Sequence, residues 1–187
     1  MSRARARDTM KRFYELFLSV RDLPVPTVAA INGHAIGAGL CITLGCDLRV
    51  ADAGAKLAFN FSQLGIHPGM GATWTLPRLV GPALAADLLY TGRTLSGEEA
   101  AAIGLVSRAV PRDDVLAEAT ALARRIAEAA PLPVRGIKHA LRHSAERTLD
   151  QQLAWEAEQQ ALCYETGDMQ EGLAAAREKR APRFRGR

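Results

Sequence analysis

The stretch Asn32–Cys46, NGHAIGAGLCITLGC, decides the fold, because closely spaced glycines join a strand end to an apolar segment. The run TVAAI at 27–31 precedes it and predicts a short strand. Gly37 and Gly39 flank Ala38, and the segment LCITLGC that follows indicates a buried helix. This order predicts free backbone N–H groups at a buried helix N-terminus, which favours negative charge. The glycines also fit a simpler role, tight packing between helix and strand.

The segments on either side of this stretch alternate between helix and strand. Apolar residues at helical spacing predict a helix over 4–21. Strands are expected over 47–52 and 56–61, and a turn-rich stretch around Pro68 and Gly69 leads into a short helix. These elements indicate an α/β fold.

The chain from Pro82 onward is predicted to be mostly helical. Ser96 and Glu99 form a capping-box pattern. Asp168 and Glu171 are expected to cap a last helix that reaches about Arg180. We expect a partial core in 1–130 and a helical region in 131–187. Helices are predicted at 82–91, 96–104, 113–129, 132–145 and 148–165, a strand at 105–110, and an irregular tail after 180.

The composition is that of an ordinary globular protein, with 48% hydrophobic and 24% charged residues. The net charge is +4, but the basic residues are scattered except at the two ends, which argues against a nucleic-acid surface. A mild positive excess also suits a small polyanionic ligand. No apolar stretch is long enough to span a bilayer, so we expect no membrane partner.

The cysteines Cys41, Cys46 and Cys163 predict reduced thiols and a cytoplasmic setting, since their number is odd. We also expect no metal site.

Six segments together resemble successive signatures of the crotonase superfamily, the enoyl-CoA hydratase/isomerase family. They occur in the family's order and at its spacing, from about Pro24 to Arg185. The segments are VAAINGHAIGAG, CDLRVA, LGIHPGMGA, LPRLVG, TGRTLSGEEAAAIGLVSRAVP and EGLAAAREKRAPRF.

The resemblance implies a crotonase-like spiral of ββα units, with a helical C-terminal trimerisation region. It also implies an acyl-CoA thioester ligand, an assembly that is a homotrimer or a dimer of trimers, and no cofactor beyond the coenzyme A of the substrate. Ala38 matches an oxyanion-hole N–H donor, with Gly37 beside it in the binding site. Lys179 matches a basic residue that meets coenzyme A phosphates, although a solvated lysine at a helix end is an equal alternative.

Three departures from the family pattern concern the catalytic acids. The positions of the two hydratase glutamates hold Cys41 and Phe61, and the position of an aspartate used by some isomerases and dehalogenases holds Gly69. Residues 31–80 contain only two acids, Asp47 and Asp52. Hydration needs one group to activate water and another to protonate the α-carbon, so hydratase activity is not expected.

Among the remaining polar side chains, His67 is the candidate base, because an imidazole titrates near neutrality. The alternative is that His67 hydrogen-bonds its own turn, and a structural role is also favoured for His34. Cys41 on an apolar helix is most often a small buried hydrophobe. Phe61 belongs to a possible apolar acyl pocket with Phe59, Leu64 and Trp74, although these four side chains fit a core equally well.

The family pattern also includes early strands and a first oxyanion-hole N–H before the present Met1. Either a late start codon or a true truncation would account for this N-terminal shortening, and we favour the former. We therefore expect an acyl-CoA-processing protein, either a lyase or an isomerase of fatty acid metabolism, that stabilises a thioester enolate. The alternatives are a non-catalytic acyl-CoA-binding protein and, third, a basic RNA-binding homologue.

Overall fold

The computed structural model describes residues 2–187, which form two compact units. The first unit holds the residues through Leu23 and Thr27–Ala121, and the second holds Pro24–Pro26 and Leu122–Arg187. The assignment of an acyl-CoA site to 1–130 and of oligomerisation to 131–187 concerns function and stays a prediction.

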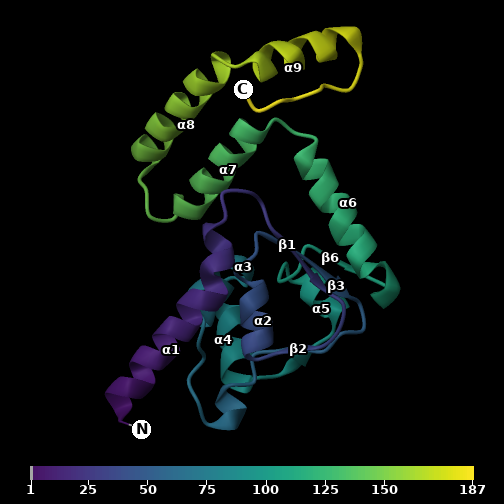
Figure 1. Cartoon of the computed structure of the whole chain (residues 1–187). Coiled ribbons are helices and arrows are strands. Elements are labelled where there is room, and N and C mark those ends of the chain that lie inside the picture. Colours follow the sequence, from purple (N-terminus) through teal and green to yellow (C-terminus); the bar gives the residue numbers. More distant parts are fainter. Residues whose placement is uncertain (1) are drawn as a thin grey trace. The chain divides into compact units, whose positions relative to one another are not determined.

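Two three-stranded sheets organise the first unit (Figure 1). In the first sheet all neighbours are parallel, with Val28 opposite Leu48 and Val50 opposite Arg108. In the second sheet one pair is parallel and the other is antiparallel. The first sheet has the order β1 (Val28–Ile31), β3 (Leu48–Asp52), β6 (Arg108–Val110), and the second the order β2 (Ala35–Ile36), β4 (Leu57–Ala58), β5 (Thr94–Leu95).

The helices of the first unit contribute to its core. Ala72 and Leu76 of one helix and Ala85, Leu88 and Leu89 of the next are buried, so both helices direct apolar side chains into the core. The α-helices are α1 (Arg3–Leu18), α2 (Ala38–Thr43), α3 (Ala72–Val80), α4 (Pro82–Thr91), α5 (Gly97–Ala102) and α6 (Val115–Ala127). The last of these continues into the second unit. Short 3-10 turns lie at Ser19–Asp22, Ser62–Leu64 and Arg112–Asp114.

The core of the first unit forms around the central strand β3. Its residues Val50 and Ala51 are fully buried, as expected for a parallel strand covered on both faces. Leu40 and Cys41 of α2 and Leu57 of β4 are buried equally deeply. The short helix α2 is therefore held by packing rather than by its own length.

Helix α5 begins with the capping box predicted for Ser96 and Glu99, and both of its hydrogen bonds are present. The next residue, Gly97, lies directly against the backbone of the β3 end. A Cβ at this position would overlap the Asp52 carbonyl oxygen, and Glu98 N–H donates to the Ala53 carbonyl at 3.2 Å. Backbone meets backbone here, and only glycine allows the approach.

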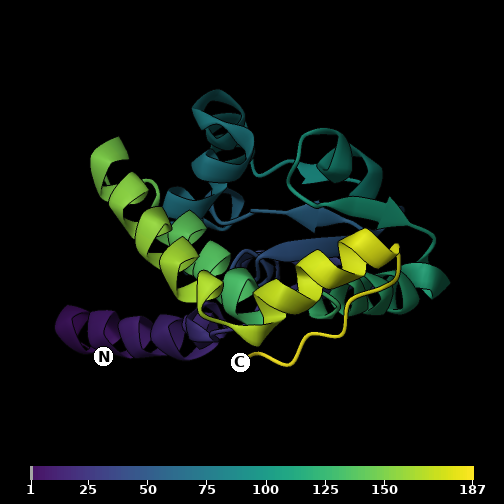
Figure 2. The same ribbon diagram turned by 90° about the horizontal axis from the view of Figure 1, so that it is seen from above.

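The second unit consists of helices followed by an extended tail, which runs back beside the last helix (Figure 2). The His139 ring stacks on His143 at 4.3 Å and on Trp155 at 4.2 Å between centroids, which packs one helix on the next. The helices are α7 (Pro131–His143), α8 (Leu149–Tyr164) and α9 (Gly167–Glu178).

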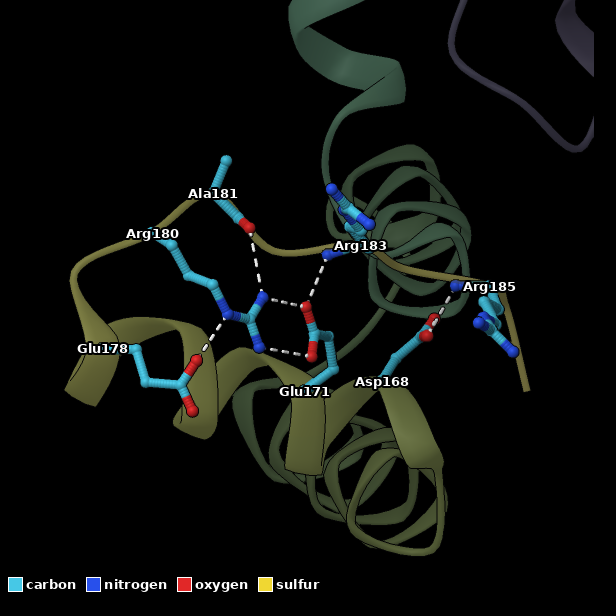
Figure 3. A network of polar contacts seen from close by, with 7 residues as sticks. All are labelled: Asp168, Glu171, Glu178, Arg180, Ala181, Arg183 and Arg185. Carbon is cyan, nitrogen blue, oxygen red and sulfur yellow. Dashed lines mark hydrogen bonds and ion pairs between the residues drawn. The ribbon is translucent and has the colours of Figure 1, made fainter.

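Two carboxylates of α9 hold the tail (Figure 3). Asp168, which is 5% exposed, accepts hydrogen bonds from the N–H groups of Arg185 at 2.6 Å and Gly186 at 2.7 Å. Glu171 accepts from the Arg183 N–H at 2.7 Å and from both Nη atoms of Arg180. The expectation that Asp168 and Glu171 cap α9 is wrong, because the Thr166 side chain caps the helix and these carboxylates bind the tail instead.

Most predicted elements are present, but their ends differ. The strand expected over 56–61 is limited to Leu57–Ala58, because Phe61 already begins a 3-10 turn. The strand expected over 105–110 starts at Arg108, because Leu105 and Val106 enter the core directly after α5. The two-residue strands β2 and β5 were not predicted.

Two helices also have different ends from those predicted. Helix α2 starts at Ala38, before the apolar run that predicted it, because Gly37 provides the turn into the helix. The helix expected over 4–21 becomes a 3-10 turn after Leu18.

Candidate functional site

The start of α2 presents a backbone donor to the surface. Gly37 has φ +56° and ψ −120°, a conformation that strains any residue with a Cβ. Its N–H donates to the Ala58 carbonyl at 2.8 Å, and its carbonyl accepts from the Cys41 N–H at 3.1 Å. Among residues 2–187, the Ala38 N–H makes no backbone hydrogen bond. This N–H is thus available to a ligand.

The prediction that this helix N-terminus is buried is wrong in one respect. Ala38 and Gly39 are exposed, while the following residues Leu40 and Cys41 are fully buried. The helix therefore inserts its apolar face into the core and leaves its first turn accessible.

Asn60 and Phe61 border this first turn. A Cβ at Gly37 would lie 3.2 Å from Asn60 Oδ1 and 3.8 Å from Phe61 Cζ, so both side chains pack where a larger residue 37 would extend. Phe61 is 8% exposed and belongs to the core cluster. The structure thus brings together Gly37, Ala38 and Phe61, three of the residues predicted for binding, and adds Asn60.

Cys41 lies on the inner face of α2 with no exposed surface. Burial raises the pKa of its thiol to about 12, so the thiol is protonated at neutral pH. A thiol in this state is a poor nucleophile and a poor base. Its position fits a small core residue.

The two acids of residues 31–80 accept hydrogen bonds from backbone N–H groups. Asp47 Oδ2 accepts from the Thr27 N–H at 2.7 Å and from the Thr27 hydroxyl at 2.9 Å. Asp52 Oδ1 accepts from the Gly54 N–H at 2.9 Å in a turn. Both carboxylates therefore have structural roles.

The two histidines of this region have different environments. His34 Nδ1 accepts a hydrogen bond from the Lys56 N–H at 3.0 Å, which ties it to the neighbouring loop. His67 is exposed, and its Nδ1 lies 2.7 Å from the Pro68 carbonyl oxygen. Because a carbonyl can only accept, Nδ1 carries the proton and Nε2 is left as the basic nitrogen.

Tyr14 of α1 is a residue that the sequence reasoning missed. A Cβ at Gly69 would lie 2.5 Å from Tyr14 Oη, so the phenol occupies the space beside this glycine. Tyr14 is half-buried against the core cluster. The two residues are far apart in sequence, and no local pattern predicts their contact.

The other candidates for an apolar acyl pocket lie in different environments. Phe59 is buried in the core, Leu64 is exposed, and Trp74 is partly exposed. The indole of Trp74 has the guanidinium of Arg78 at 3.9 Å and that of Arg21 at 4.9 Å from its ring centroid.

Lys179 lies in the second unit, at the C-cap of α9. Its φ of +54° is left-handed, and its N–H donates to the Ala176 carbonyl at 3.4 Å. The side chain is exposed at the negative end of the helix. Both the solvated role and the ligand role remain compatible with this position.

Metal binding and membrane insertion are two further possibilities for the described residues. No group of three or more His, Cys, Asp or Glu side chains within 2–187 is placed to hold a metal ion. In the same residues, no helix combines the length and apolarity needed to cross a membrane.

Comparisons with known proteins point to one family. The profile of the Enoyl-CoA hydratase/isomerase family matches residues 1–187. The chain is 41% identical over 191 residues to human enoyl-CoA hydratase domain-containing protein 2, mitochondrial, and covers 65% of that protein. It is 38% identical over 170 residues to crotonyl-CoA hydratase of Syntrophomonas wolfei, with 91% of this chain and 65% of the relative covered.

Solved structures give the same result. An enoyl-CoA hydratase from Bacillus anthracis superposes with a TM-score of 0.93 at 37% identity, covering 100% of this chain and 72% of that one. A probable enoyl-CoA hydratase/isomerase from Mycobacterium abscessus gives a TM-score of 0.94 at 33% identity, with 100% and 72% covered. The crotonase-like fold is therefore confirmed.

The chain spans 64% of the length of the bovine enoyl-CoA hydratase domain-containing protein 2 and 54% of rat methylglutaconyl-CoA hydratase. The family match itself runs over the whole chain. This protein belongs to the enoyl-CoA hydratase/isomerase family of the crotonase superfamily.

Proposed function

We propose that this protein binds an acyl-CoA thioester and stabilises the thioester enolate with the Ala38 N–H. The observation that carries this proposal is the first turn of α2, where Ala38 is exposed and its N–H makes no backbone hydrogen bond within the described chain. A preorganised N–H aimed at a developing oxyanion typically contributes about 10²–10³-fold to a rate. Membership of the family supports a coenzyme A thioester as the ligand.

The proton transfers that follow need a group other than Cys41 or Phe61. His67 is our candidate, because its Nε2 remains basic while Nδ1 donates to Pro68. The Tyr14 hydroxyl is a second candidate donor, because it lies beside Gly69, which is on the same loop as His67. On this basis we assign the protein to lyase or isomerase chemistry on acyl-CoA, with no cofactor beyond the substrate's own coenzyme A.

A non-catalytic acyl-CoA-binding protein is the second candidate function. One observation favours it: both acids of residues 31–80 accept hydrogen bonds from backbone N–H groups, as described for Asp47 and Asp52. Binding of the thioester would then occur without turnover.

The assembly and cellular setting are also proposals. Exposed apolar side chains on α8, among them Leu149, Leu153 and Leu162, suit burial against a second copy, and we propose a homotrimer or a dimer of trimers. Cys41, Cys46 and Cys163 form no disulfide within the described residues, which suits a cytoplasmic setting.

A chromophoric thioester tests these functions directly. In 4-dimethylaminocinnamoyl-CoA, hydrogen bonding to the thioester carbonyl draws electron density along the conjugated chain and shifts absorption to longer wavelength. We expect the parent protein to bind it with such a shift. Gly37→Ala should lose the shift, because a Cβ there is strained and meets Asn60.

The alternatives give different results in the same experiment. Unshifted binding by the parent would remove the oxyanion proposal and leave the acyl-CoA-binding protein. Absence of thioester binding, together with RNA binding that falls steeply with salt, would favour the RNA-binding homologue.

A further inference from the structure

The side chain of Arg49 is almost wholly buried in the first unit, although it carries a charge. It projects from the central strand β3 and is 4% exposed. Its Nε donates to the Leu105 carbonyl at 2.8 Å, and its Nη1 donates to the carbonyls of Cys46 at 2.8 Å and Thr43 at 3.3 Å. A guanidinium is costly to bury, so these hydrogen bonds offset a substantial desolvation penalty.

Two of the three acceptors lie at the C-terminal end of α2. Thr43 is the last residue of the helix, and Cys46 follows shortly after it. Carbonyls at a helix C-terminus lack partners within the helix and carry the negative end of its dipole. Arg49 supplies both a hydrogen-bond donor and a positive charge at this end.

Arg49 is also bound to the segment before β6, through its own backbone and through the third acceptor, the Leu105 carbonyl. Arg49 N–H donates to the Ser107 hydroxyl at 3.2 Å, and Ser107 N–H donates to the Arg49 carbonyl at 2.8 Å. With the bond to Leu105, residue 49 is therefore tied to the segment that leads into β6. The end of α2 is thus attached to the sheet rather than to a surface loop.

The length of α2 makes such an attachment necessary. Its six residues form fewer than two turns, and a helix this short is unstable in isolation. At its start, the Gly37 N–H is bound to β4 through the Ala58 carbonyl. Arg49 provides the polar attachment at the other end, so its loss would leave the helix held by one polar attachment and by its apolar packing.

We propose that Arg49 is a positioning residue for the Ala38 N–H, acting through α2. This inference rests on the proposed function, since it concerns the donor that polarises the thioester. Arg49 itself touches no substrate. It holds the helix in the orientation in which Ala38 presents its N–H.

Hydrogen exchange of the ligand-free protein tests the positioning independently of any ligand. In Arg49→Met, which keeps an unbranched stem and removes the guanidinium, we expect the amides of 41–46 to exchange about 10- to 100-fold faster, the range for losing hydrogen bonds to a charged group. The amides of β1 should be unchanged. Arg93→Met, which removes an exposed arginine paired with Asp87 in the same unit, should leave 41–46 at the parent rate.

The spectral shift of bound 4-dimethylaminocinnamoyl-CoA is the second measurement. Arg49→Met should bind the thioester with most of the shift lost, and Arg49→Lys should recover part of it, because one ammonium can reach some of the carbonyls. If Arg49→Met does not fold, Arg49→Lys decides alone, with a partial loss of shift and intermediate exchange expected.

Parent-like exchange over 41–46 in a folded Arg49 variant would overturn the proposal, as would a full spectral shift. A parent protein that shows no shift contradicts the proposed function instead. In that case faster exchange still establishes that Arg49 anchors α2, whereas unchanged exchange removes both proposals.

Discussion

Residues 31–80 and the segment 167–187 use acidic side chains in different ways. The first segment surrounds the start of α2 and contains two acids. Asp52 accepts from the backbone of its own turn, and Asp47 accepts from the Thr27 N–H, 20 positions earlier. The second contains Asp168 and Glu171, which bind a tail that approaches from the C-terminal side. These four carboxylates therefore stabilise the fold, whereas the candidate site depends on the backbone N–H of Ala38.

The largest expected effect concerns hydration of crotonyl-CoA. Each missing acid–base group typically costs about 10²–10⁴-fold. The resemblance to the family places the two hydratase glutamates at positions 41 and 61, where this chain has Cys41 and Phe61. We expect turnover far below the roughly 10 per second of an ordinary enzyme, measured as loss of enoyl thioester absorbance with a family hydratase as positive control. Turnover near that ordinary value would show that residues outside these positions carry the proton transfers.

Reactivity of Cys41 gives the next largest effect. With a pKa raised from 9.0 to about 12, the thiol ionises about 1000-fold less than an ordinary cysteine at the same pH. Alkylation with iodoacetamide, mapped by mass spectrometry, should label Cys46 and Cys163 while Cys41 stays unmodified until unfolding. Equal labelling of all three cysteines would contradict the buried position of Cys41.

Lys179→Ala tests the ligand role of the second unit. We expect acyl-CoA binding to weaken by about 1–3 kcal/mol, roughly the value of one hydrogen bond to a charged group, with the fold intact. Isothermal titration gives the dissociation constant. Lys11→Ala removes an equivalent exposed charge on α1 and should bind as the parent does. Parent-like binding by Lys179→Ala would leave this lysine with only a helix-end role.

Asp168→Asn weakens the attachment of the tail. The amide keeps one acceptor oxygen and places an NH₂ group against a backbone N–H, so one of the two bonds to Arg185 and Gly186 is lost. We expect the free energy of unfolding, measured in urea, to fall by about 1–3 kcal/mol. Proteolysis after Arg183 or Arg185 should become faster. Glu158→Gln, an exposed change on α8, is the control. A tail as resistant as the parent's would mean that this carboxylate is dispensable.

The smallest effect is the pH dependence of Glu171. Hydrogen bonds from Arg180 and from the Arg183 N–H lower the pKa of this carboxyl from 4.5 to about 2. A depressed pKa favours the folded state while the carboxylate is charged, so the contribution is complete above about pH 4.5 and is lost as the pH falls toward 2. Thermal unfolding midpoints of the parent and of Glu171→Gln should therefore converge over this range. A constant difference between the two proteins would assign the stabilisation to something other than ionisation.

The sequence predicted those features that depend on neighbouring residues. The capping box of Ser96 and Glu99 follows from a short-range pattern, and the structure contains it. The helix predicted for LCITLGC is present only through Thr43. The strands β2 and β5 have two residues each, too few to show an alternating pattern. The family signatures supplied the fold, which periodicity alone would not have specified.

The unpredicted features depend on contacts between distant residues. In the sequence, Asp168 resembles a helix cap. The N–H groups that donate to its carboxylate lie 17 and 18 residues further along the chain, so a local pattern does not reveal them. Tyr14 reaches Gly69 across 55 positions, and Arg49 reaches Leu105 across 56. The accessibility of Ala38 likewise depends on what covers the first turn of α2, which a local pattern does not contain.

The contact of Gly97 with the Asp52 carbonyl has a consequence for variation of this sequence. In a saturation library, position 97 should reject every substitution, alanine included, because the obstacle is main chain and cannot rotate away. Gly33, with no atom near its would-be Cβ, should accept many residues. Selection for folded protein alone should therefore retain only glycine at position 97 but many residues at position 33. In recombination with relatives, folded products should have β3 and α5 from the same parent.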